Sequence, residues 1–418
     1  MNVLIKSAKI LDSESDFNNE TVDILITNGN IEKIAESIEN SENLKEITFD
    51  NLHVSQGWFD SSVSFGEPGY EERETIANGL NTAAKSGFTN VVLNPNTNPI
   101  IDTSSDIAFV KSKAAGSTTD LHPLGALTRN SEGNDLAELF DMKNAGAVAF
   151  YDFQSPISNP NLLKIALQYC SNFDGLVLSF PQEPQISGMG VMNENAMSTS
   201  LGLKGNPNLA EELQISRDLF ILEYTGGKLH IPTISTEKSV ELIREAKKKG
   251  LDVSCSVAIH NLVLTDNELE EFETKYKVLP PLRTKSDKDA LIEGLIDGTI
   301  DMVTSNHNPI DIEHKKVEFD YAKYGTIGLE SAFGALNKIL PTSNTIALLT
   351  QGKERFGIKN NPIIAGNKAD LTLFNPEGDY SFSKAQMLST SKNAIFEGKS
   401  LKGKVYGVIN NNQHTLKN

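Results

Sequence analysis

The sequence is poor in cysteine, because its 418 residues include only Cys170 and Cys255. The two thiols are far apart and show no paired spacing, so the sequence predicts neither a disulfide framework nor a cluster of thiolate metal ligands. It also lacks an apolar run of roughly 18 residues, the length that crosses a membrane. The N-terminus has no apolar segment of signal-peptide type. We therefore expect a cytoplasmic protein with two buried thiols and no membrane partner.

Positive charge is also scarce. The chain has 38 Lys and Arg residues against 55 Asp and Glu residues, a formal net charge of −17. A polyanion would be repelled by such a surface, which argues against a nucleic-acid partner. The acidic surface otherwise indicates only solubility. With 39% apolar and 22% charged residues the composition is that of a globular protein. The length suits a barrel of roughly 250–300 residues with an accessory part.

Both ends of the chain have strand-like patterns. Short apolar or alternating runs with turn residues between them are typical of hairpins, and Asn28-Gly29 supplies the φ > 0 residues of a tight turn. The expected strands are Val3–Ile5, Ile10–Leu11, Asp23–Ile26, Ile31–Ile34, Asp370–Phe374, Lys392–Phe396 and Gly403–Ile409, the last followed by a polar tail. We predict one β-domain composed of residues 1–55 and 365–418.

Between these ends, residues 56–364 alternate between strand-like and helix-like segments. The expected strand centres are Trp58, Val91, Leu124, Val148, Val177, Ile231, Val253 and Met302. Eight strands alternating with helices are the number for a (β/α)₈ barrel. The predicted fold class is therefore α/β, a (β/α)₈ TIM-like barrel with a small β-domain built from both termini. A doubly wound sheet is the alternative.

The stretch Gln56–Pro99 begins the barrel. It contains a strand ending in Asp60, a loop with Glu67-Pro68-Gly69, a helix over Glu71–Ser86, a strand over Asn90–Leu93, and Asn94-Pro95-Asn96-Thr97. This stretch resembles the opening of the dihydroorotase family, with its patterns P-G-x-I-D-x-H-V-H-L-R-E-P-G, G-G-F-T-x-V and M-P-N-T-x-P. The resemblance extends over nearly the whole chain. It implies a barrel with a small β-sandwich domain, and a hydrolase of cyclic amides that works in pyrimidine biosynthesis.

The resemblance also implies a site at the carboxyl ends of the barrel strands, where zinc lowers the pKa of a bound water. Several family positions carry other residues in this sequence. Ser62, Ser64, Phe180 and Thr233 stand where the family has zinc-binding histidines, Gly66 where it has a substrate-binding arginine, Leu279 where it has a substrate-binding asparagine, and Asn306 where it has the aspartate general base. Asp152 and Asn96 match the family, although either could be purely structural.

These replacements change the chemistry that the site can do. A serine hydroxyl is a poor zinc ligand, a phenyl ring is no ligand, and an asparagine amide cannot accept a proton in the usual pH range. We therefore expect no zinc cofactor and no intact catalytic residue. The sequence predicts a catalytically inactive dihydroorotase-like protein with a structural or regulatory role. The family resemblance implies aspartate carbamoyltransferase as a partner and a homodimer as the assembly.

Two other functions remain open. The first is an active metal-dependent dihydroorotase, or another cyclic amidohydrolase, whose ligands the sequence pattern does not reveal. The second is a small-molecule binding protein with a pocket lined by Ser62, Asn96, Phe180 and Asn306. The seven histidines favour neither, because no two of them are spaced at i, i+2 or i, i+4. No G-x-S-x-G motif suggests a serine hydrolase.

Overall fold

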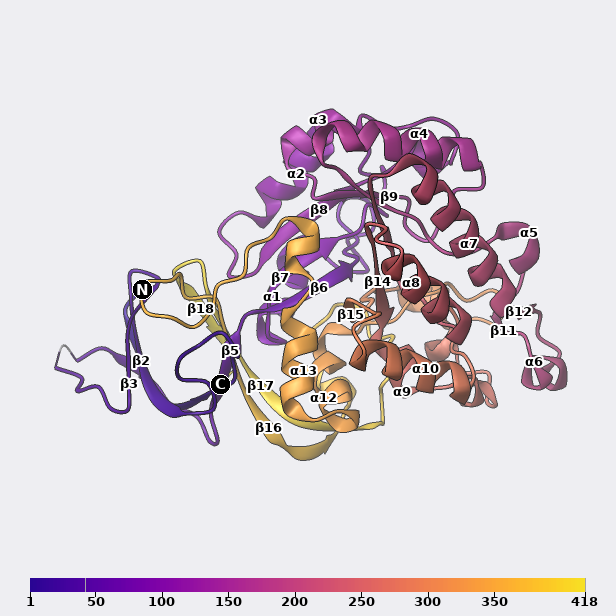
Figure 1. Cartoon of the computed structure of the whole chain (residues 1–418). Helices are drawn as coiled ribbons and strands as arrows, with labels where there is room; N and C mark the ends of the chain where they lie inside the picture. The colour runs from indigo at the N-terminus through magenta and orange to yellow at the C-terminus, as the bar shows by residue number, and fades with distance from the viewer. Residues whose placement is uncertain (42, 418) are drawn as a thin grey trace.

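Eight parallel strands form a barrel at the centre of the molecule (Figure 1). The computed structural model describes residues 1–41 and 43–417. In spatial order the strands are β6-β7-β8-β9-β10-β13-β14-β15, and every hydrogen-bonded pair is parallel. Their bounds are β6 Trp58–Val63, β7 Phe88–Leu93, β8 Asp120–Gly125, β9 Ala149–Tyr151, β10 Leu176–Leu178, β13 Lys228–Ile231, β14 Val253–Ala258 and β15 Met302–Thr304.

The first and last strands close the barrel through the carboxylate of Asp60, which is fully buried on β6. It accepts hydrogen bonds from Thr304 Oγ1 at 2.5 Å, from the Ser305 backbone N–H at 3.0 Å and from the Ser62 backbone N–H at 3.1 Å. Burial raises the pKa of this carboxyl, and the hydrogen bonds from Ser305, Thr304 and Ser62 oppose the shift. One side chain thus joins β6 to the end of β15.

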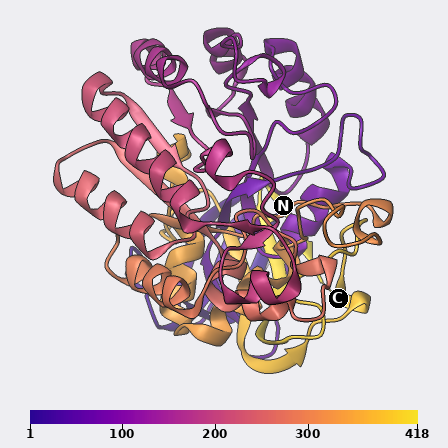
Figure 2. The same cartoon turned by 90° about the vertical axis from the view of Figure 1, so that its right-hand side faces the viewer.

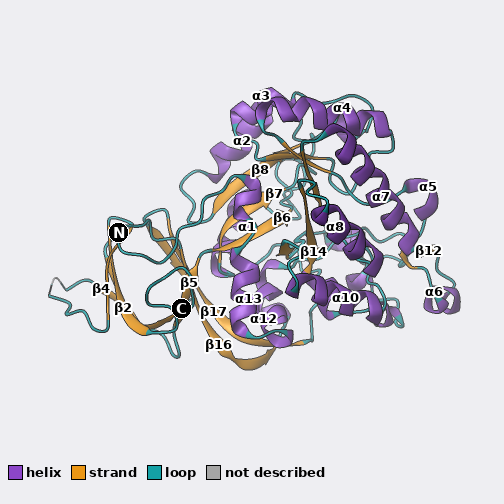
Figure 3. Ribbon diagram, in the orientation of Figure 1, coloured by secondary structure: helices purple, strands orange, loops and turns teal. Residues whose placement is uncertain are grey.

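Helices surround the strands (Figure 2, Figure 3). The longer ones are α1 Ile76–Lys85, α2 Ser104–Ala114, α3 Leu139–Ala145, α4 Pro160–Cys170, α7 Asn208–Thr225, α8 Glu237–Lys248, α10 Lys285–Ile296, α12 Leu329–Ile339 and α13 Thr342–Thr350. The short ones are α5 Pro184–Ser187, α6 Ala196–Leu201, α9 Ile259–Val263 and α11 Ile312–Lys315. Near α5 and α6, β11 Met192–Asn193 pairs with β12 Gly205–Asn206.

Local sequence explains where these helices begin and which face they bury. Thr103 and Thr284 form capping boxes with Asp106 and Asp287 at the starts of α2 and α10. On α8 the residues Val240, Ile243 and Ala246 are buried, at the three-residue spacing of one helix face, while its Lys and Glu residues are largely exposed. The helices therefore pack an apolar side on the barrel.

The barrel interior is filled with side chains. On β10, Leu176 and Leu178 belong to an inner cluster, whereas Val177 between them packs in the outer core, as the alternation of a strand requires. The inner cluster consists of Phe59, Val92, Leu124, Ala149, Tyr151, Leu176, Leu178, Phe180, Leu279, Met302 and Phe356. The barrel is a packed core, and any site must lie at its end.

A second sheet combines the two ends of the chain (Figure 1). Its strands are β1 Val3–Ile10, β2 Thr21–Thr27, β3 Asn30–Ala35, β4 Lys45–Ile47, β5 His53–Gln56, β16 Leu371–Ser381, β17 Ser400–Asn410 and β18 Gln413–Leu416. The N-terminal strand β5 pairs antiparallel with the C-terminal strand β16. Asn28 and Gly29 have φ values of 52° and 79°, as the β2–β3 hairpin turn requires.

The predicted fold class is confirmed, with several local differences. Val3–Ile5 and Ile10–Leu11 lie largely on one strand, β1, which continues through a register shift between Ile5 and Ala8. The segment Lys392–Phe396 is not a strand and makes only an isolated bridge at Ala394. The C-terminal polar tail forms β18. The boundaries of the two domains stay a prediction.

Cys170 and Cys255 are free and buried, as the sequence predicted. No helix in residues 1–41 and 43–417 is both long and apolar enough to cross a membrane.

Thr304→Val tests the closure of the barrel. The variant removes a hydroxyl donor from the buried Asp60 carboxylate, so we expect the free energy of unfolding to fall by about 1–3 kcal/mol. Urea unfolding measures the change. The matched control is Thr82→Val, because Thr82 is also fully buried but its hydroxyl has no hydrogen-bond partner among the described residues. Equal stability of the two variants would contradict the assigned role of Asp60.

Candidate functional site at the barrel mouth

The nine candidate positions come from the segments that follow the barrel strands. Ser62 is the penultimate residue of β6, and Ser64 and Gly66 follow the strand. Asn96, Asp152, Phe180, Thr233 and Asn306 follow β7, β9, β10, β13 and β15, and Leu279 precedes α10. Because parallel strands end on the same side of a barrel, these positions belong to one end, which we call the mouth. All are buried except Asn96, which is half-buried.

Two serines and an asparagine form the polar part of the mouth. Asn94 Nδ2 donates to Ser62 Oγ at 3.0 Å and lies 3.1 Å from Ser64 Oγ. Ser62 and Ser64 are 6% and 3% exposed. Where the family resemblance implies two imidazoles, this chain therefore has a small hydrogen-bonded cluster of hydroxyls and one amide.

An apolar part lies beside it. Phe180 and Leu279 belong to the cluster that fills the barrel interior. The backbone carbonyl of Leu279 accepts hydrogen bonds from Gln154 Nε2 at 3.1 Å and from Asn306 Nδ2 at 3.4 Å. The loop carrying Leu279 is thus tied to the ends of β9 and β15, and it covers this side of the mouth.

The backbone at two mouth positions is in the left-handed region. Thr233 has a φ of 55° and Asn306 a φ of 48°. Asparagine tolerates this region, but a β-branched threonine rarely adopts it. A hydrogen bond holds Thr233 in this conformation, because its backbone N–H donates to Ser256 Oγ at 3.2 Å. Such conformations persist only where the surrounding structure imposes them, and they gather at functional sites.

Asp152 and His230 are engaged in structural contacts. Asp152 accepts hydrogen bonds from Thr128 N at 3.0 Å and Thr128 Oγ1 at 2.5 Å, and burial raises its pKa. His230 lies between Ser254 Oγ at 2.8 Å and Ser256 Oγ at 3.3 Å. Burial lowers the pKa of His230 to about 3, so its imidazole is neutral. Both side chains stabilise the ends of strands.

Gly66 occupies a position with no room for a side chain. A Cβ atom there would lie 1.8 Å from the Tyr70 carbonyl oxygen. The Tyr70 backbone N–H in turn donates to the Gly66 carbonyl at 2.6 Å, so the loop is folded tightly at this point. An arginine, which the family resemblance implies here, would require a different path of the loop.

The mouth does not provide a zinc site. Zinc in proteins is held by three or four imidazole, thiolate or carboxylate ligands. Ser62, Ser64, Phe180, Thr233 and Asn306 offer hydroxyls, a phenyl ring and an amide. Within residues 1–41 and 43–417 no group of three or more His, Cys, Asp or Glu side chains could hold a metal ion. The side chains present therefore do not fit the zinc of the family.

Two polar residues of this region were not among the candidates. Asn94 holds the serine cluster, and its place directly after β7 is the only sequence signal for it. His307 is fully buried, and its backbone carbonyl accepts from Ser64 N at 2.7 Å. Its Nδ1 accepts from Gly328 N at 3.1 Å, which places the proton on Nε2. Burial lowers the pKa of His307, so the ring is neutral.

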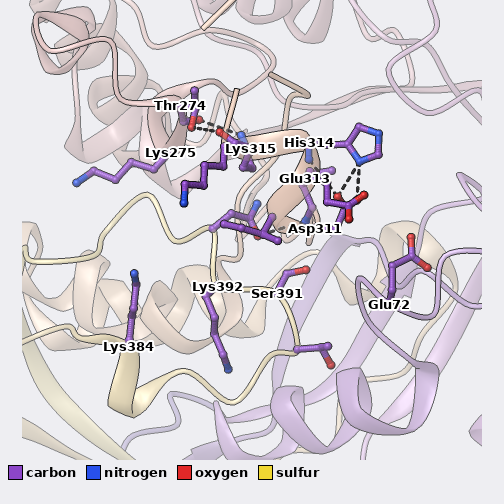
Figure 4. A pocket seen from close by; sticks show the side chains of 15 residues that line it. Glu72, Thr274, Lys275, Asp311, Glu313, His314, Lys315, Lys384, Ser391 and Lys392 are labelled. Carbon is purple, nitrogen blue, oxygen red and sulfur yellow. Dashed lines mark hydrogen bonds and ion pairs between the residues drawn. The ribbon is translucent and has the colours of Figure 1, made fainter. Parts of the chain in front are cut away.

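A charged cavity of about 800 Å³ is formed in part by residues that follow β15 (Figure 4). Lys275 and Lys384 lie on one side of it, and Glu72 and Asp311 on the other. His314 Nδ1 is 2.7 Å from Asp311 Oδ1. None of the nine candidate positions lines this cavity.

Comparisons with known proteins identify relatives over the full chain. Residues 53–239 match the family model described as Dihydro-orotase-like. A protein named Dihydroorotase from Pelotomaculum thermopropionicum is 38% identical over 416 residues, which cover 98% of this chain and 97% of the relative. Another Dihydroorotase, from Ruminiclostridium cellulolyticum, is 38% identical over 411 residues and 96% of each chain.

A solved structure has a similar fold over the full length of this chain. The L-hydantoinase (dihydropyrimidinase) of Arthrobacter aurescens has a TM-score of 0.85 at 22% identity, covering 100% of this chain and 96% of that one. At this identity the likeness shows the fold alone, and that fold agrees with the barrel and second sheet described above.

The sequence relatives contradict the prediction of a catalytically inactive protein. Relatives that align over nearly the whole chain carry the name of an enzyme, and nothing in the structure demonstrates inactivity. The prediction rested on replaced side chains. Those replacements show which metal ligands are missing but do not establish that the chemistry is lost.

The absence of zinc as a cofactor stays a prediction. We expect the protein to purify without stoichiometric zinc, because Ser62, Ser64, Phe180 and Thr233 provide no imidazole. Elemental analysis of the purified chain measures this. The matched comparison is a variant with Ser62→His, Ser64→His, Phe180→His, Thr233→His and Asn306→Asp, which we expect to bind zinc. About one tightly held zinc per unmodified chain would contradict the prediction.

Proposed function

Because the chain belongs to the dihydroorotase family of cyclic amidohydrolases, we propose that it is an active dihydroorotase. Such an enzyme makes or breaks the C–N bond of a cyclic amide. The observation that carries the proposal is the 38% identity to named dihydroorotases over 98% of the chain. In the hydrolytic direction, the hydroxyl of water joins the carbonyl carbon, the C–N bond breaks, and a proton goes to the nitrogen.

The backbone of the mouth supports this proposal. Thr233 and Asn306 keep left-handed conformations at the ends of two strands, and strain of this kind is typical of functional sites. Thr233 is the more informative of the two, because a β-branched residue gains nothing from φ of 55° by itself. The strained backbone at Thr233 therefore supports a functional site at this end of the barrel.

The polar side chains can bind and orient a ring with amide groups. The hydroxyls of Ser62 and Ser64 can donate and accept, and the amides of Asn94 and Asn306 present both a carbonyl and an N–H₂ group. The Asn306 Nδ2 bond to Leu279 is long, at 3.4 Å, so this donor is free to turn to a ligand. A donor placed at the reacting carbonyl would stabilise the negative charge that develops there.

Two unpartnered atoms add to this set. Asn96 Oδ1 and His307 Nε2 are buried and have no hydrogen-bond partner among the described residues. An unpaired buried polar atom costs roughly 1–3 kcal/mol, which a bound polar ligand can recover. The proposal rests on the family relation and on these groups, and it assigns no role to a metal at the family's zinc positions.

Turnover of dihydroorotate by the purified full-length chain tests the proposal. We expect a rate that is proportional to protein concentration and unchanged by a chelator, since residues 1–41 and 43–417 contain no group of three or more His, Cys, Asp or Glu side chains that could hold a metal ion. Asn306→Ala should lower kcat/KM by about 100-fold, the effect of losing a donor at a reacting carbonyl. The matched control is Asn28→Ala, because Asn28 has a similar φ of 52° but lies in the hairpin of the second sheet.

The proposal would be wrong if the wild-type chain showed no turnover above the buffer in either direction. Equal losses of kcat/KM in Asn306→Ala and Asn28→Ala would show that the reaction does not take place at the mouth. The cytoplasmic location, and the aspartate carbamoyltransferase partner that the family resemblance implies, stay predictions. Sedimentation of the chain with and without that enzyme tests the partner.

A further inference from the structure

The charged cavity of about 800 Å³ beside α11 separates positive from negative side chains. Figure 4 shows Lys275, Lys384 and Lys392 on one side of it and Glu72 and Asp311 on the other. Acidic residues outnumber basic ones by 17 in the whole chain, yet five lysines and only three acidic residues line this cavity. A local excess of amines on an acidic protein attracts anions.

The acidic side of the cavity has a basic partner of its own, Arg73. Asp311 Oδ2 accepts a hydrogen bond from Arg73 Nε at 3.0 Å. The other oxygen of Asp311 accepts from the His314 backbone N–H at 3.1 Å and lies 2.7 Å from His314 Nδ1. Glu72 is 3.9 Å from Arg73. These two carboxylates are therefore not available to neutralise the lysines on the other side.

Three of the lining lysines pair with no carboxylate in the part of the chain that the structure describes. They are Lys315, Lys316 and Lys392. Lys392 Nζ donates to the backbone carbonyls of Met387 at 3.0 Å and Ser389 at 2.5 Å, and Lys316 is exposed. Carbonyl oxygens carry no net charge, so the positive charge of these side chains is left for a ligand to neutralise.

Lys315 is the buried amine of this group, at only 5% exposure. Its Nζ donates to the carbonyls of Thr274 at 3.0 Å and Lys277 at 3.2 Å. An ammonium group has three donors, so these two bonds leave one N–H without a partner. Burial lowers the pKa of Lys315 to about 7, and the positive charge of Lys277 adds to the shift. An anion that accepts the third N–H would restore the charged form.

The chemistry of the two sides indicates the class of ligand. Several ammonium groups bind a phosphate as point charges, whereas a carboxylate is held best by the planar fork of an arginine. The cavity volume is in the usual range for a small organic molecule. Opposite the lysines, the carboxylate of Glu72 can accept hydrogen bonds from hydroxyl groups. Ser391 Oγ donates to the Arg73 carbonyl at 3.0 Å, so its oxygen can accept another.

We propose that this cavity binds a small phosphate monoester that carries hydroxyl groups. The phosphate lies against Lys315, Lys316 and Lys392, and the hydroxyl groups face Glu72 and Ser391. None of the nine candidate positions of the mouth lines the cavity, so the proposal does not depend on the function assigned to the mouth.

Calorimetric titration of the full-length chain with glucose 6-phosphate, in a buffer without phosphate or sulfate, tests the site. We expect one molecule to bind per chain, and glucose at the same concentrations not to bind. Lys315→Met should raise the dissociation constant about 10-fold or more, as for the loss of a hydrogen bond to a charged group. Lys316→Gln should also weaken binding, and because Lys316 is exposed this variant leaves the core intact.

The matched control is Lys248→Met, which removes the same charge from an exposed position on α8, outside the cavity. It should bind glucose 6-phosphate as the wild type does. No binding to the wild type, equal binding of glucose, or an equal loss of affinity in Lys315→Met and Lys248→Met would overturn the proposal.

Proton uptake tests the role of Lys315 separately. At about pH 8 its amine is mostly neutral without a ligand, and a phosphate dianion beside it favours the charged form and so raises its pKa. Binding should therefore take up a proton, and affinity should fall as the pH rises above about 7. The other charged or titratable side chains around it are Lys277 and, lining the cavity, Glu72, Lys275, Asp311, Glu313, His314, Lys316, Lys384 and Lys392.

Titrations in two buffers with different enthalpies of ionisation count the protons taken up. His314→Gln should keep the uptake, whereas Lys315→Met should lose it. Uptake that persists in Lys315→Met, or that disappears in His314→Gln, would contradict the assignment of Lys315 as the phosphate-binding amine.

Discussion

The buried carboxylate of Asp60 is the contact on which the mouth of the barrel depends. It stands on the first strand and accepts hydrogen bonds from Thr304 and Ser305 at the end of the last one. A carboxylate buried away from solvent is costly unless several donors surround it, and the backbone N–H of Ser62 is the third donor. Further along the two segments, the backbone N–H of Ser64 donates a hydrogen bond to the His307 carbonyl. A sheet of eight strands becomes a closed barrel, and the segments after its strands meet at one end.

Much of the fold could be predicted because it follows local rules. The alternation of apolar strands with amphipathic helices gave the barrel, and seven of the eight expected centres lie on barrel strands, while Val148 lies one residue before β9. The Asn28-Gly29 turn follows from residues that tolerate positive φ. The helix expected from Glu71 begins only at Ile76, because Thr75 caps it by accepting the Asn78 N–H. Lys392–Phe396 has a strand-like composition, but no neighbouring strand pairs along it.

The site was less accessible to sequence reasoning, because its properties depend on contacts between distant residues. The sequence indicated that Ser62 and Ser64 could not hold zinc. It did not indicate that Asn94 would link them, since this contact depends on how β7 lies beside β6. Likewise Gly66 is read as a missing arginine from the sequence alone, whereas the structure shows a loop whose Tyr70 carbonyl leaves no space for any side chain.

The prediction of an inactive protein failed for a related reason. It treated each replaced residue as the loss of one function, whereas relatives that carry the name of the enzyme align with nearly the whole chain. Their 38% identity extends over 96–98% of the chain and is not confined to the segments around the family's metal ligands. We therefore propose that the side chains of the mouth act together to bind a ring.

The central claim is that the mouth binds the cyclic amide, and a crystal structure of the full-length chain with dihydroorotate tests it most directly. The account predicts the ring at the ends of the barrel strands, in hydrogen-bond contact with Asn306 and with the cluster of Ser62, Ser64 and Asn94. A ring bound in the charged cavity beside Lys275 and Asp311, or a mouth that remains closed by Phe180 and Leu279 at saturating dihydroorotate, would contradict it.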